Sequence, residues 1–352
     1  MSDWQWLERV HARALRELTT VRLAVLVAGV IAAAIVLHGV GTVPLVDVHL
    51  AIARDPMAPL HELGRRGYLL HSPGLVLLAY ALHATTKLTF AALGLVIAGL
   101  GLAWQVWLAR RHHGDAGARM LAIAWFAGPL AAVLVTWLGQ PDPITVVAAG
   151  TLVLARARPL LVLAGFVLGF NHFEAGVPMI ASAGLLLVVE RRAWLDTVLA
   201  GLGLAGGKLA LFAWQAAHDQ DPISRLAYVR ETGWERYVIS ALGNVPAWLY
   251  STFSVAWPLV AVAFVGAGRG VRRAMLASAL LAAITALATL DPTRVFALVS
   301  WPLVVFAVTR RADLRAGAWV MLAALVIPRV LVWEGGVIAS GFHHLLVDAL
   351  GR

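Results

Sequence analysis

The polar residues most suggestive of chemistry lie in residues 38–71, within a chain that is otherwise mostly apolar. Asp47 and His49 stand two residues apart there, among valine and leucine, and no proline follows Asp47. These apolar neighbours predict partial burial of Asp47, which would raise its pKa and suit it to act as a general base, with His49 beside it. A solvated or salt-bridged loop carboxylate is the alternative. A polar stretch of this length that folds is usually functional.

Two further polar groups lie in short joints between apolar runs. Gln140 and Asp142 belong to the joint GQPDP, and His172 and Glu174 belong to the joint NHFE. His172 and Glu174 have no obvious local partner, so they could bind substrate hydroxyls or a metal ion. A hydrogen-bonded helix terminus is the alternative for NHFE, and a helix cap followed by proline is the alternative for Asp142.

Arginine could supply an anion site at two places. Arg294 follows Asp291 by one helical turn, so the pair could bind a phosphate with Asp291 orienting the guanidinium, or could simply cancel its own charges. The Asp-Pro sequence at 291–292 also suits a helix cap. Arg65 and Arg66 would suit a lipid phosphate at the membrane edge, with surface anchoring as the alternative.

Several chemistries have little or no support in the sequence. The chain has no cysteine, which excludes disulfides, thiolate zinc sites and cysteine nucleophiles. No glycine-rich phosphate loop, nucleophile elbow or HExxH spacing occurs. A divalent metal such as Mg²⁺ or Mn²⁺ is possible, but the only DxD triplet, at 219–221, runs into a proline and reads equally well as a helix cap.

The composition indicates what must position these residues. Of 352 residues, 61% are hydrophobic and 13% are charged, whereas a soluble domain carries about 25% charged residues. The mean hydropathy is +0.81. We therefore expect a single integral-membrane domain over residues 1–352, an all-α polytopic bundle of about eleven segments. The expected segments are 21–37, 90–108, 120–138, 144–155, 160–170, 175–189, 195–214, 245–265, 274–290, 295–308 and 316–333.

Residues outside these segments divide into an N-terminal arm and two long loops. Residues 1–20 predict a cytoplasmic amphipathic helix that contacts membrane lipids. Residues 38–72 and 215–244 predict the first and second external loops, and the apolar run 74–83 is too short to span, so it is expected to be interfacial or re-entrant.

Arginine pairs occur in alternate joints, which assigns each joint to a side of the membrane. The positive-inside rule places these joints and the N-terminus in the cytoplasm, and both long loops outside, in the inner (plasma) membrane of the cell. The same distribution explains the high pI without nucleic-acid binding.

Segment lengths predict a cavity. A spanning helix needs about 20 residues, but 144–155 and 160–170 have about a dozen, roughly 18 Å at 1.5 Å per residue, and 274–290 and 295–308 are also short. Their outer ends should stop below the outer surface, where polar groups are tolerated only when they line protein or a wet cavity. We expect an outward-facing polar cavity at joints 139–143, 171–174 and 291–294, with dipping helices, under the 38–71 loop.

This layout resembles the GT-C superfamily of integral-membrane glycosyltransferases. Asp47 matches the acidic residue that follows the first helix in that family, GQPDP is similar to the Gly-Gln-x-Asp joints of some mannosyl- and related transferases, and Asp291-Pro292-Thr293-Arg294 matches a phosphate-side contact. Many members carry a paired or DxD-like acidic motif in the first loop, whereas here the partner position of Asp47 is His49.

The resemblance implies transfer of a sugar from a polyprenyl-phosphate donor to a glycan, lipid or protein acceptor on the extracytoplasmic face, by an inverting single displacement. Asp47 would be the base and His49 its neighbour. Arg294, Arg65 or Arg66 would hold the leaving phosphate. The residues expected to bind sugar hydroxyls are Gln140, Asp142, His172 and Glu174.

Other functions remain open on the sequence. A lipid-linked glycan polymerase or ligase would share the compartment and substrates, and the 215–244 loop would then matter more. A transporter or flippase could use the same cavity, but such folds often show internal repeats, and we find none. A non-catalytic assembly protein would have little use for so many costly sunken charges.

Overall fold

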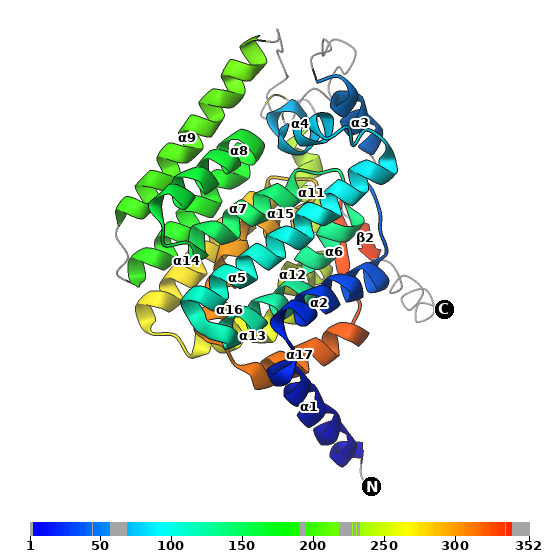
Figure 1. Cartoon of the computed structure of the whole chain (residues 1–352), viewed down its shortest axis with the longest axis vertical. Helices are drawn as coiled ribbons and strands as arrows, with labels where there is room; N and C mark the ends of the chain where they lie inside the picture. The colour runs from blue at the N-terminus through cyan, green and yellow to red at the C-terminus, as the bar shows by residue number, and fades with distance from the viewer. Residues whose placement is uncertain are drawn as a thin grey trace.

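The computed structural model describes residues 3–43, 45–56, 69–190, 194–217, 227, 230, 233–334 and 336–339. Arg65 and Arg66, the acidic triplet at 219–221 and the end of the chain therefore lie outside the described residues. The described chain is helical almost throughout (Figure 1). The predicted helical class is thus confirmed.

The elements follow one another along the chain with short connections. The first helices are α1 (Asp3–Thr20), α2 (Leu23–His38), α3 (Val46–Arg54), α4 (Gly74–Ala81), α5 (Lys87–Ala127), α6 (Pro129–Thr136), α7 (Asp142–Leu154), α8 (Arg158–Val189) and α9 (Trp194–Ala217). The later elements are α11 (Trp234–Leu242), α12 (Val245–Phe253), η3 (Ser254–Ala256), α13 (Trp257–Val265), α14 (Arg269–Leu287), α15 (Pro292–Val299), α16 (Trp301–Arg310), α17 (Leu314–Val326), β1 (Val330–Trp333) and β2 (Gly336–Ala339).

Helices α5 and α8 each turn back on themselves at one residue. Helix α8 breaks at His172, and a Cβ on Gly176 would lie 3.0 Å from the Cβ of Leu168, although eight residues of continuous helix would separate them by about 12 Å. Helix α5 breaks at Gly114, which has a φ of 77°, and Gly94 again approaches Leu138. The predicted segments on either side of each break are thus antiparallel neighbours.

Helix α9 packs against the first half of α8 through four glycines. Gly165 and Gly169 approach carbonyls of α9, and Gly203 and Gly207 approach carbonyls of α8. A Cβ at any of these positions would lie 2.0–2.1 Å from the facing carbonyl oxygen. Small residues four apart on both helices allow this close backbone contact, a packing mode that is common between helices in membranes.

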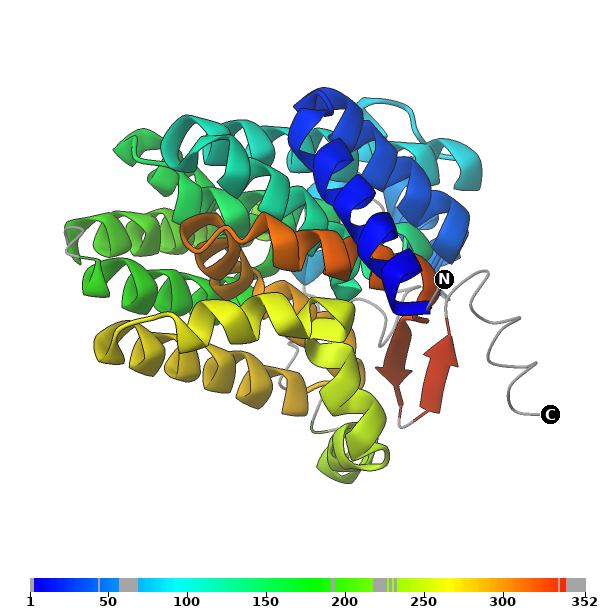
Figure 2. The same ribbon diagram turned by 90° about the horizontal axis from the view of Figure 1, so that it is seen from below.

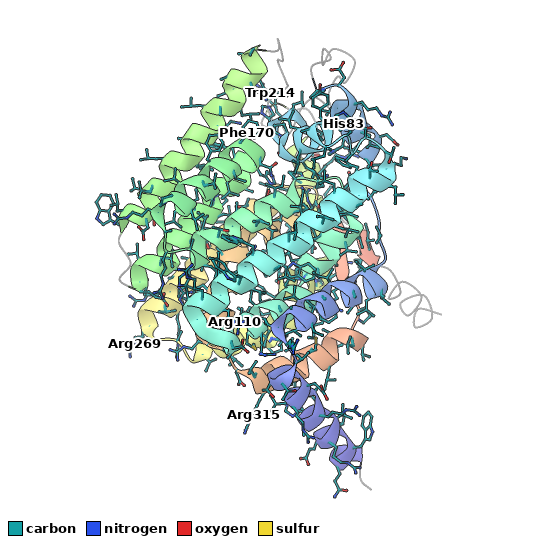
Figure 3. The ribbon with its side chains drawn as sticks, in the orientation of Figure 1. His83, Arg110, Phe170, Trp214, Arg269 and Arg315 are labelled. Carbon is teal, nitrogen blue, oxygen red and sulfur yellow. The ribbon has the colours of Figure 1, made fainter. Side chains whose placement is uncertain are left out.

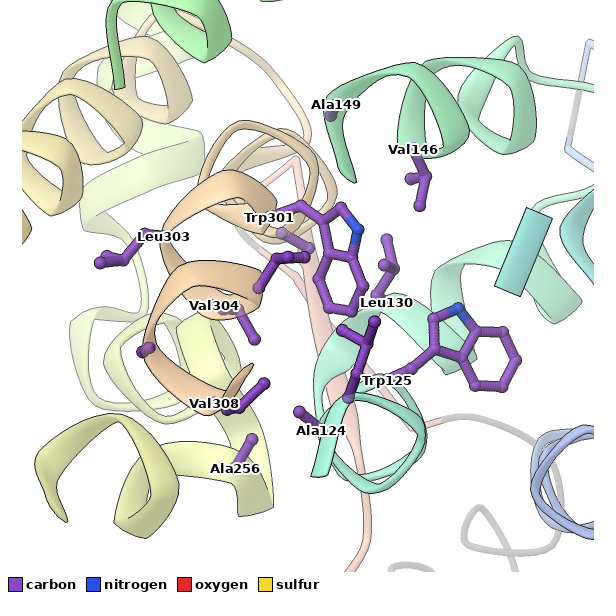
Figure 4. Close-up of a cluster of buried hydrophobic side chains, with 14 of the residues drawn as sticks. Ala124, Trp125, Leu130, Val146, Ala149, Ala256, Trp301, Leu303, Val304 and Val308 are labelled. Carbon is purple, nitrogen blue, oxygen red and sulfur yellow. The ribbon is translucent and has the colours of Figure 1, made fainter. Parts of the chain in front are cut away.

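Helix α16 forms the centre of the bundle. Every residue from Trp301 to Thr309 is buried. The ring nitrogen of Trp301 donates to the side-chain oxygen of Gln105 at 2.9 Å, and Gln105 in turn donates to the carbonyl of Val146 at 2.9 Å. Figure 4 shows side chains of α16 against those of α5, α6 and α7. The contact satisfies buried polar groups that would otherwise destabilise an apolar core.

The bundle has a basic end and an opposite end. Arg110, Arg269 and Arg315 lie toward one end, and His83, Phe170 and Trp214 lie toward the other (Figure 3). We call these the basic end and the cavity end. Large apolar side chains such as Leu202, Leu209 and Leu280 are exposed along the sides, as expected of a lipid-facing surface.

Within the described residues, five helices are long and apolar enough to cross a membrane, or six if the bent pair α15–α16 counts as one span. They are α5, α8, α9, the run Val245–Val265 and α14. This is consistent with a membrane protein, while the count of about eleven segments stays a prediction. One length was wrong: the segment expected at 274–290 begins at Arg269, so α14 is not short.

The last predicted segment is also partly wrong. Helix α17 ends at Val326, and β1 pairs with β2 in an antiparallel hairpin. Pro328 explains the change, because the residue before a proline is disfavoured in helix. Figure 2 shows the hairpin beside the bundle, on the side away from α8 and α9.

The N-terminal arm is the helix predicted for residues 1–20, but it also packs on protein. His11 stacks on Trp319 of α17 with 4.3 Å between ring centroids. The buried guanidinium of Arg119 donates to the carbonyls of Leu18 and Val21 at 2.6 and 2.8 Å. These carbonyls are orphaned by the end of α1, so Arg119 fixes where the arm leaves the bundle.

The glycine contact between α8 and α9 gives a matched test. Gly207→Ala places a Cβ 2.0 Å from the carbonyl oxygen of Phe166, whereas the nearest atom to a Cβ on Gly206 is a ring carbon of that residue at 3.8 Å. We expect Gly207→Ala to lower the free energy of unfolding by about 1–3 kcal/mol through overpacking. Gly206→Ala should be neutral or raise it by up to about 1 kcal/mol.

Thermal unfolding in detergent, followed by tryptophan fluorescence, compares the two variants. Equal midpoints would show that the two helices do not approach as closely as described.

Candidate functional site

A polar cavity of about 520 Å³ lies at the cavity end, within the described residues. Its volume falls in the range of small-molecule sites, about 300–1,000 Å³. Its polar lining residues are His49, Ser72, Gln140, His172, Glu174, Tyr237, Thr285, Thr289, Asp291, Arg294 and Glu334. Its main apolar walls are Val43, Leu45, Leu69, Trp137, Leu290, Val295 and Trp333. The three joints expected to be sunken therefore meet in one cavity, and the first loop contributes to its wall.

The first loop is fastened to the joint that precedes α7. Thr42 and Leu138 form an isolated bridge, in which the amide of Val43 donates to the carbonyl of Leu138 at 3.0 Å. Gly41 allows this approach, since a Cβ there would lie 2.6 Å from the carbonyl oxygen of Thr136. Residues 41–43 are thereby held beside Gln140.

Arg294 is at the centre of the polar cluster. Its Nε and Nη2 donate to the two carboxylate oxygens of Asp142 at 2.6 and 2.9 Å, a bidentate ion pair. Nη2 also lies 3.3 Å from Oε1 of Gln140, and Nη1 lies 3.5 Å from Oδ2 of Asp291. The main partner of Arg294 is thus Asp142, which comes 152 residues earlier in the chain, and not its neighbour Asp291.

Asp142 and Asp291 begin two helices that meet at the cavity. Asp142 is the first residue of α7, between two prolines, and its side chain is only 2% exposed. Asp291 caps α15 by accepting from the amide of Arg294 at 3.4 Å. The helix-cap alternative is therefore realised for Asp291, while Asp142 spends both of its oxygens on the arginine.

Asp291 is the carboxylate with unusual protonation. It lies in the loop between α14 and α15, outside both helices. Burial raises the pKa of Asp291 to about 7, Arg294 lowers it in part, and the charge of Asp142 raises it. Its contacts with Arg294 are long, so the guanidinium charge offsets little of the desolvation. A carboxyl with a pKa near 7 can accept or give up a proton at neutral pH.

His49 provides a neutral imidazole. Burial lowers the pKa of His49 to about 4, and the charge of Arg294 lowers it further. Neither ring nitrogen has a hydrogen-bond partner within the described residues, although His49 lines the cavity. An unsatisfied buried imidazole is costly, and a bound hydroxyl could satisfy it.

Asp47 is placed differently from its prediction. Its side chain is 72% exposed and forms an ion pair with Lys87 at 3.0 Å. Asp47 and His49 lie two apart on α3, so they face different sides of the helix, and only His49 is buried. The expected burial of Asp47 and its pairing with His49 are therefore wrong, and Asp47 is absent from the cavity lining.

His172 and Glu174 lie at the reversal of α8 and line the cavity. Glu174 lies 3.9 Å from Nζ of Lys208 on α9, and that ammonium also lies over the rings of Phe173 and Phe212. The neighbouring Asn171 donates to the carbonyl of Pro141 at 3.0 Å, which joins this reversal to the start of α7.

Sequence reasoning missed the residues that come from the C-terminal hairpin. The amide of Val332 donates to Thr293 at 2.9 Å, and the amide of Glu334 donates to the carbonyl of Leu290 at 2.8 Å. These bonds hold Trp333 against Trp137, edge to face at 5.7 Å between ring centroids. The apolar run that ends at Trp333 reads as the end of a helix, so Pro328 was the only available signal.

The described residues contain no group of three or more His, Asp and Glu side chains placed to hold a metal ion. The possible divalent metal stays a prediction. Comparisons of the chain with family models, curated proteins and solved structures give no match. The cavity chemistry therefore has to carry any functional argument.

The Asp142–Arg294 pair predicts a coupled response to substitution. Removing one partner leaves the other charged and buried, so Arg294→Gln or Asp142→Asn alone should lower the free energy of unfolding by about 3–5 kcal/mol. The double variant should lose much less than the sum of the two. Arg158→Gln, which breaks the more exposed pair with Asp196, is the control and should change it by about 0–1 kcal/mol.

Thermal unfolding of the four variants in one detergent measures this coupling. Strictly additive losses in the double variant would mean that the two side chains do not interact.

Proposed function

We propose that the chain is a membrane glycosyltransferase that moves a sugar from a polyprenyl-phosphate-linked donor to a glycan, lipid or protein acceptor. In this proposal the basic end faces the cytoplasm, by the positive-inside rule. The cavity end is then extracytoplasmic, as it must be for a lipid-linked donor used on the outer face of the inner (plasma) membrane.

The observation that carries the proposal is Asp291. A carboxyl that is buried, lines a cavity and has a pKa raised to about 7 has the properties of a general base. Asp47 has neither the burial nor the position, so we transfer the role of base from Asp47 to Asp291. Perturbed titration in a cavity favours a reacting site over a purely structural one.

The walls of the cavity suit a sugar. Trp137, Trp333 and Tyr237 offer flat apolar faces, and Gln140 and His49 offer hydrogen-bonding groups without net charge. A few placed polar groups on a mostly apolar lining are what a small-molecule site requires for orientation. Glu174 and His172 complete the set of groups that could bind hydroxyls.

The proposed reaction is a single displacement. Asp291 takes the proton of the acceptor hydroxyl, the acceptor oxygen attacks the anomeric carbon, and the bond from that carbon to the phosphate oxygen breaks. The polyprenyl phosphate leaves with the bonding electrons and needs positive charge nearby. Arg294 is already engaged by Asp142, so in this proposal Arg65 and Arg66 of the first loop contact the phosphate.

Two variants of the protein in nanodiscs separate the candidate bases. With a radiolabelled polyprenyl-phosphate sugar and a membrane acceptor extract, Asp291→Asn should reduce the transfer rate by about 10²–10⁴-fold. Asp47→Asn should retain most of it. Because the base must be ionised, the wild-type rate should rise with pH up to about 7 and then level off.

The same assay can contradict the proposal. Full transfer by Asp291→Asn would remove Asp291 as base, and loss of transfer in Asp47→Asn would restore Asp47. Products extended by many sugars or by whole oligosaccharides would favour a polymerase or ligase. Uptake of solute or lipid into proteoliposomes without transfer would favour a transporter or flippase. Chelation with EDTA, followed by Mg²⁺ or Mn²⁺, tests the metal.

Asp291 also predicts how stability depends on pH. Its folded pKa of about 7 lies above the ordinary value of 3.8, so its contribution to stability is complete below about pH 3.8 and is lost as pH rises toward 7. Asp291→Asn, which can still cap α15, should therefore unfold at a higher temperature than wild type at pH 8. The difference should shrink at pH 5.

Thermal unfolding at the two pH values checks this, with Asp47→Asn as the exposed control. A lower midpoint for Asp291→Asn at pH 8 would show that the carboxylate stabilises the fold.

A further inference from the structure

Glu334 occupies the turn of the C-terminal hairpin in an unfavourable conformation. Trp333 pairs with Gly336, which leaves two positions for the turn. The φ of Glu334 is 48°, in the left-handed region. Two-residue hairpin turns favour asparagine, aspartate or glycine at such positions, because other side chains clash with the following carbonyl.

The surrounding hairpin holds Glu334 in this conformation. Its amide donates to the carbonyl of Leu290, and the amide of Val332 donates to Thr293. Before the hairpin, the buried Arg329 donates to the carbonyls of Ala324 and Phe126. Strain that is fixed by so many contacts tends to occur at functional sites.

The position of Glu334 gives this strain a direction. Glu334 lines the cavity, directly after Trp333, and its amide bond to Leu290 brings it next to Asp291. Within the described residues, no hydrogen bond or ion pair to its carboxylate is found. An acid is therefore kept where the turn disfavours it, on the wall of a cavity, without a protein partner to explain it.

We propose that Glu334 is a substrate-binding residue whose carboxylate accepts hydrogen bonds from hydroxyls of an uncharged sugar. This inference rests on the proposed transferase function and names the class of sugar it uses. With Asp291 and Glu174 also on the lining, a further carboxylate disfavours an anionic sugar such as a hexuronic acid. The hydroxyls of a neutral sugar satisfy the carboxylate without adding negative charge.

The test uses Glu334→Asn and a matched control. Asparagine tolerates the left-handed region, so Glu334→Asn should raise the unfolding temperature while removing the acid. His83 also has a positive φ, of 55°, and is outside the cavity lining. His83→Asn should raise the unfolding temperature in the same way and leave sugar binding unchanged.

Full-length wild type, Glu334→Asn, Glu334→Gln and His83→Asn are compared in nanodiscs. We expect both Glu334 variants to raise KM for a polyprenyl-phosphate hexose by about tenfold or more, as for loss of a hydrogen bond to a charged group. The shift in unfolding temperature caused by that donor should shrink in parallel. The hexuronic acid analogue should shift wild type less than the hexose donor does.

The outcomes separate the two proposals. If KM and the ligand-induced shift of Glu334→Asn stay within twofold of wild type, Glu334 does not bind the sugar, whatever the transfer rate. If wild type transfers no sugar but is still shifted by the hexose donor, and Glu334→Asn is not, the transferase fails and the binding residue stands. If wild type neither transfers sugar nor shifts with the donor, both proposals are overturned.

Discussion

The buried ion pair between Asp142 and Arg294 is the constraint on which the cavity end depends. Taking both charges out of water costs several kcal/mol per ion unless the geometry is close to ideal, and here both carboxylate oxygens meet the guanidinium at 2.6 and 2.9 Å. Asp142 begins α7 and Arg294 lies in the first turn of α15. The pair therefore fixes two helix starts against each other, and the cavity floor follows from that relation.

The sequence carried the parts of this arrangement that depend on local patterns. Apolar runs and alternating arginine pairs define which joints share an end, because hydropathy and charge act segment by segment. Short runs before GQPDP and NHFE placed those joints below the surface. Partners could not be read in this way. The carboxylate that binds Arg294 is 152 residues away, and the exposure of Asp47 follows from its face of α3, which the sequence of a loop does not define.

Several residues of the cavity lower the stability of the protein when considered alone. Asp291 is a buried acid with a raised pKa, His49 has no hydrogen bond within the described residues, and Glu334 is in a left-handed turn. They persist because the scaffold beneath them is strongly determined, with α16 buried along its length and α8 and α9 in backbone contact. Excess stability in the bundle is what allows unfavourable groups at a site.

The cavity is also assembled from distant parts of the chain. Its wall combines Val43 and Leu45 near the first loop, Trp137 before α7, and Trp333 near the C-terminal end. The bridge from Thr42 to Leu138 and the edge-to-face contact of the two tryptophans join these three segments. Because no one segment can form the site, the cavity exists only when both ends of the chain have docked on the bundle. The same contacts that complete the fold therefore close the space around a bound ligand.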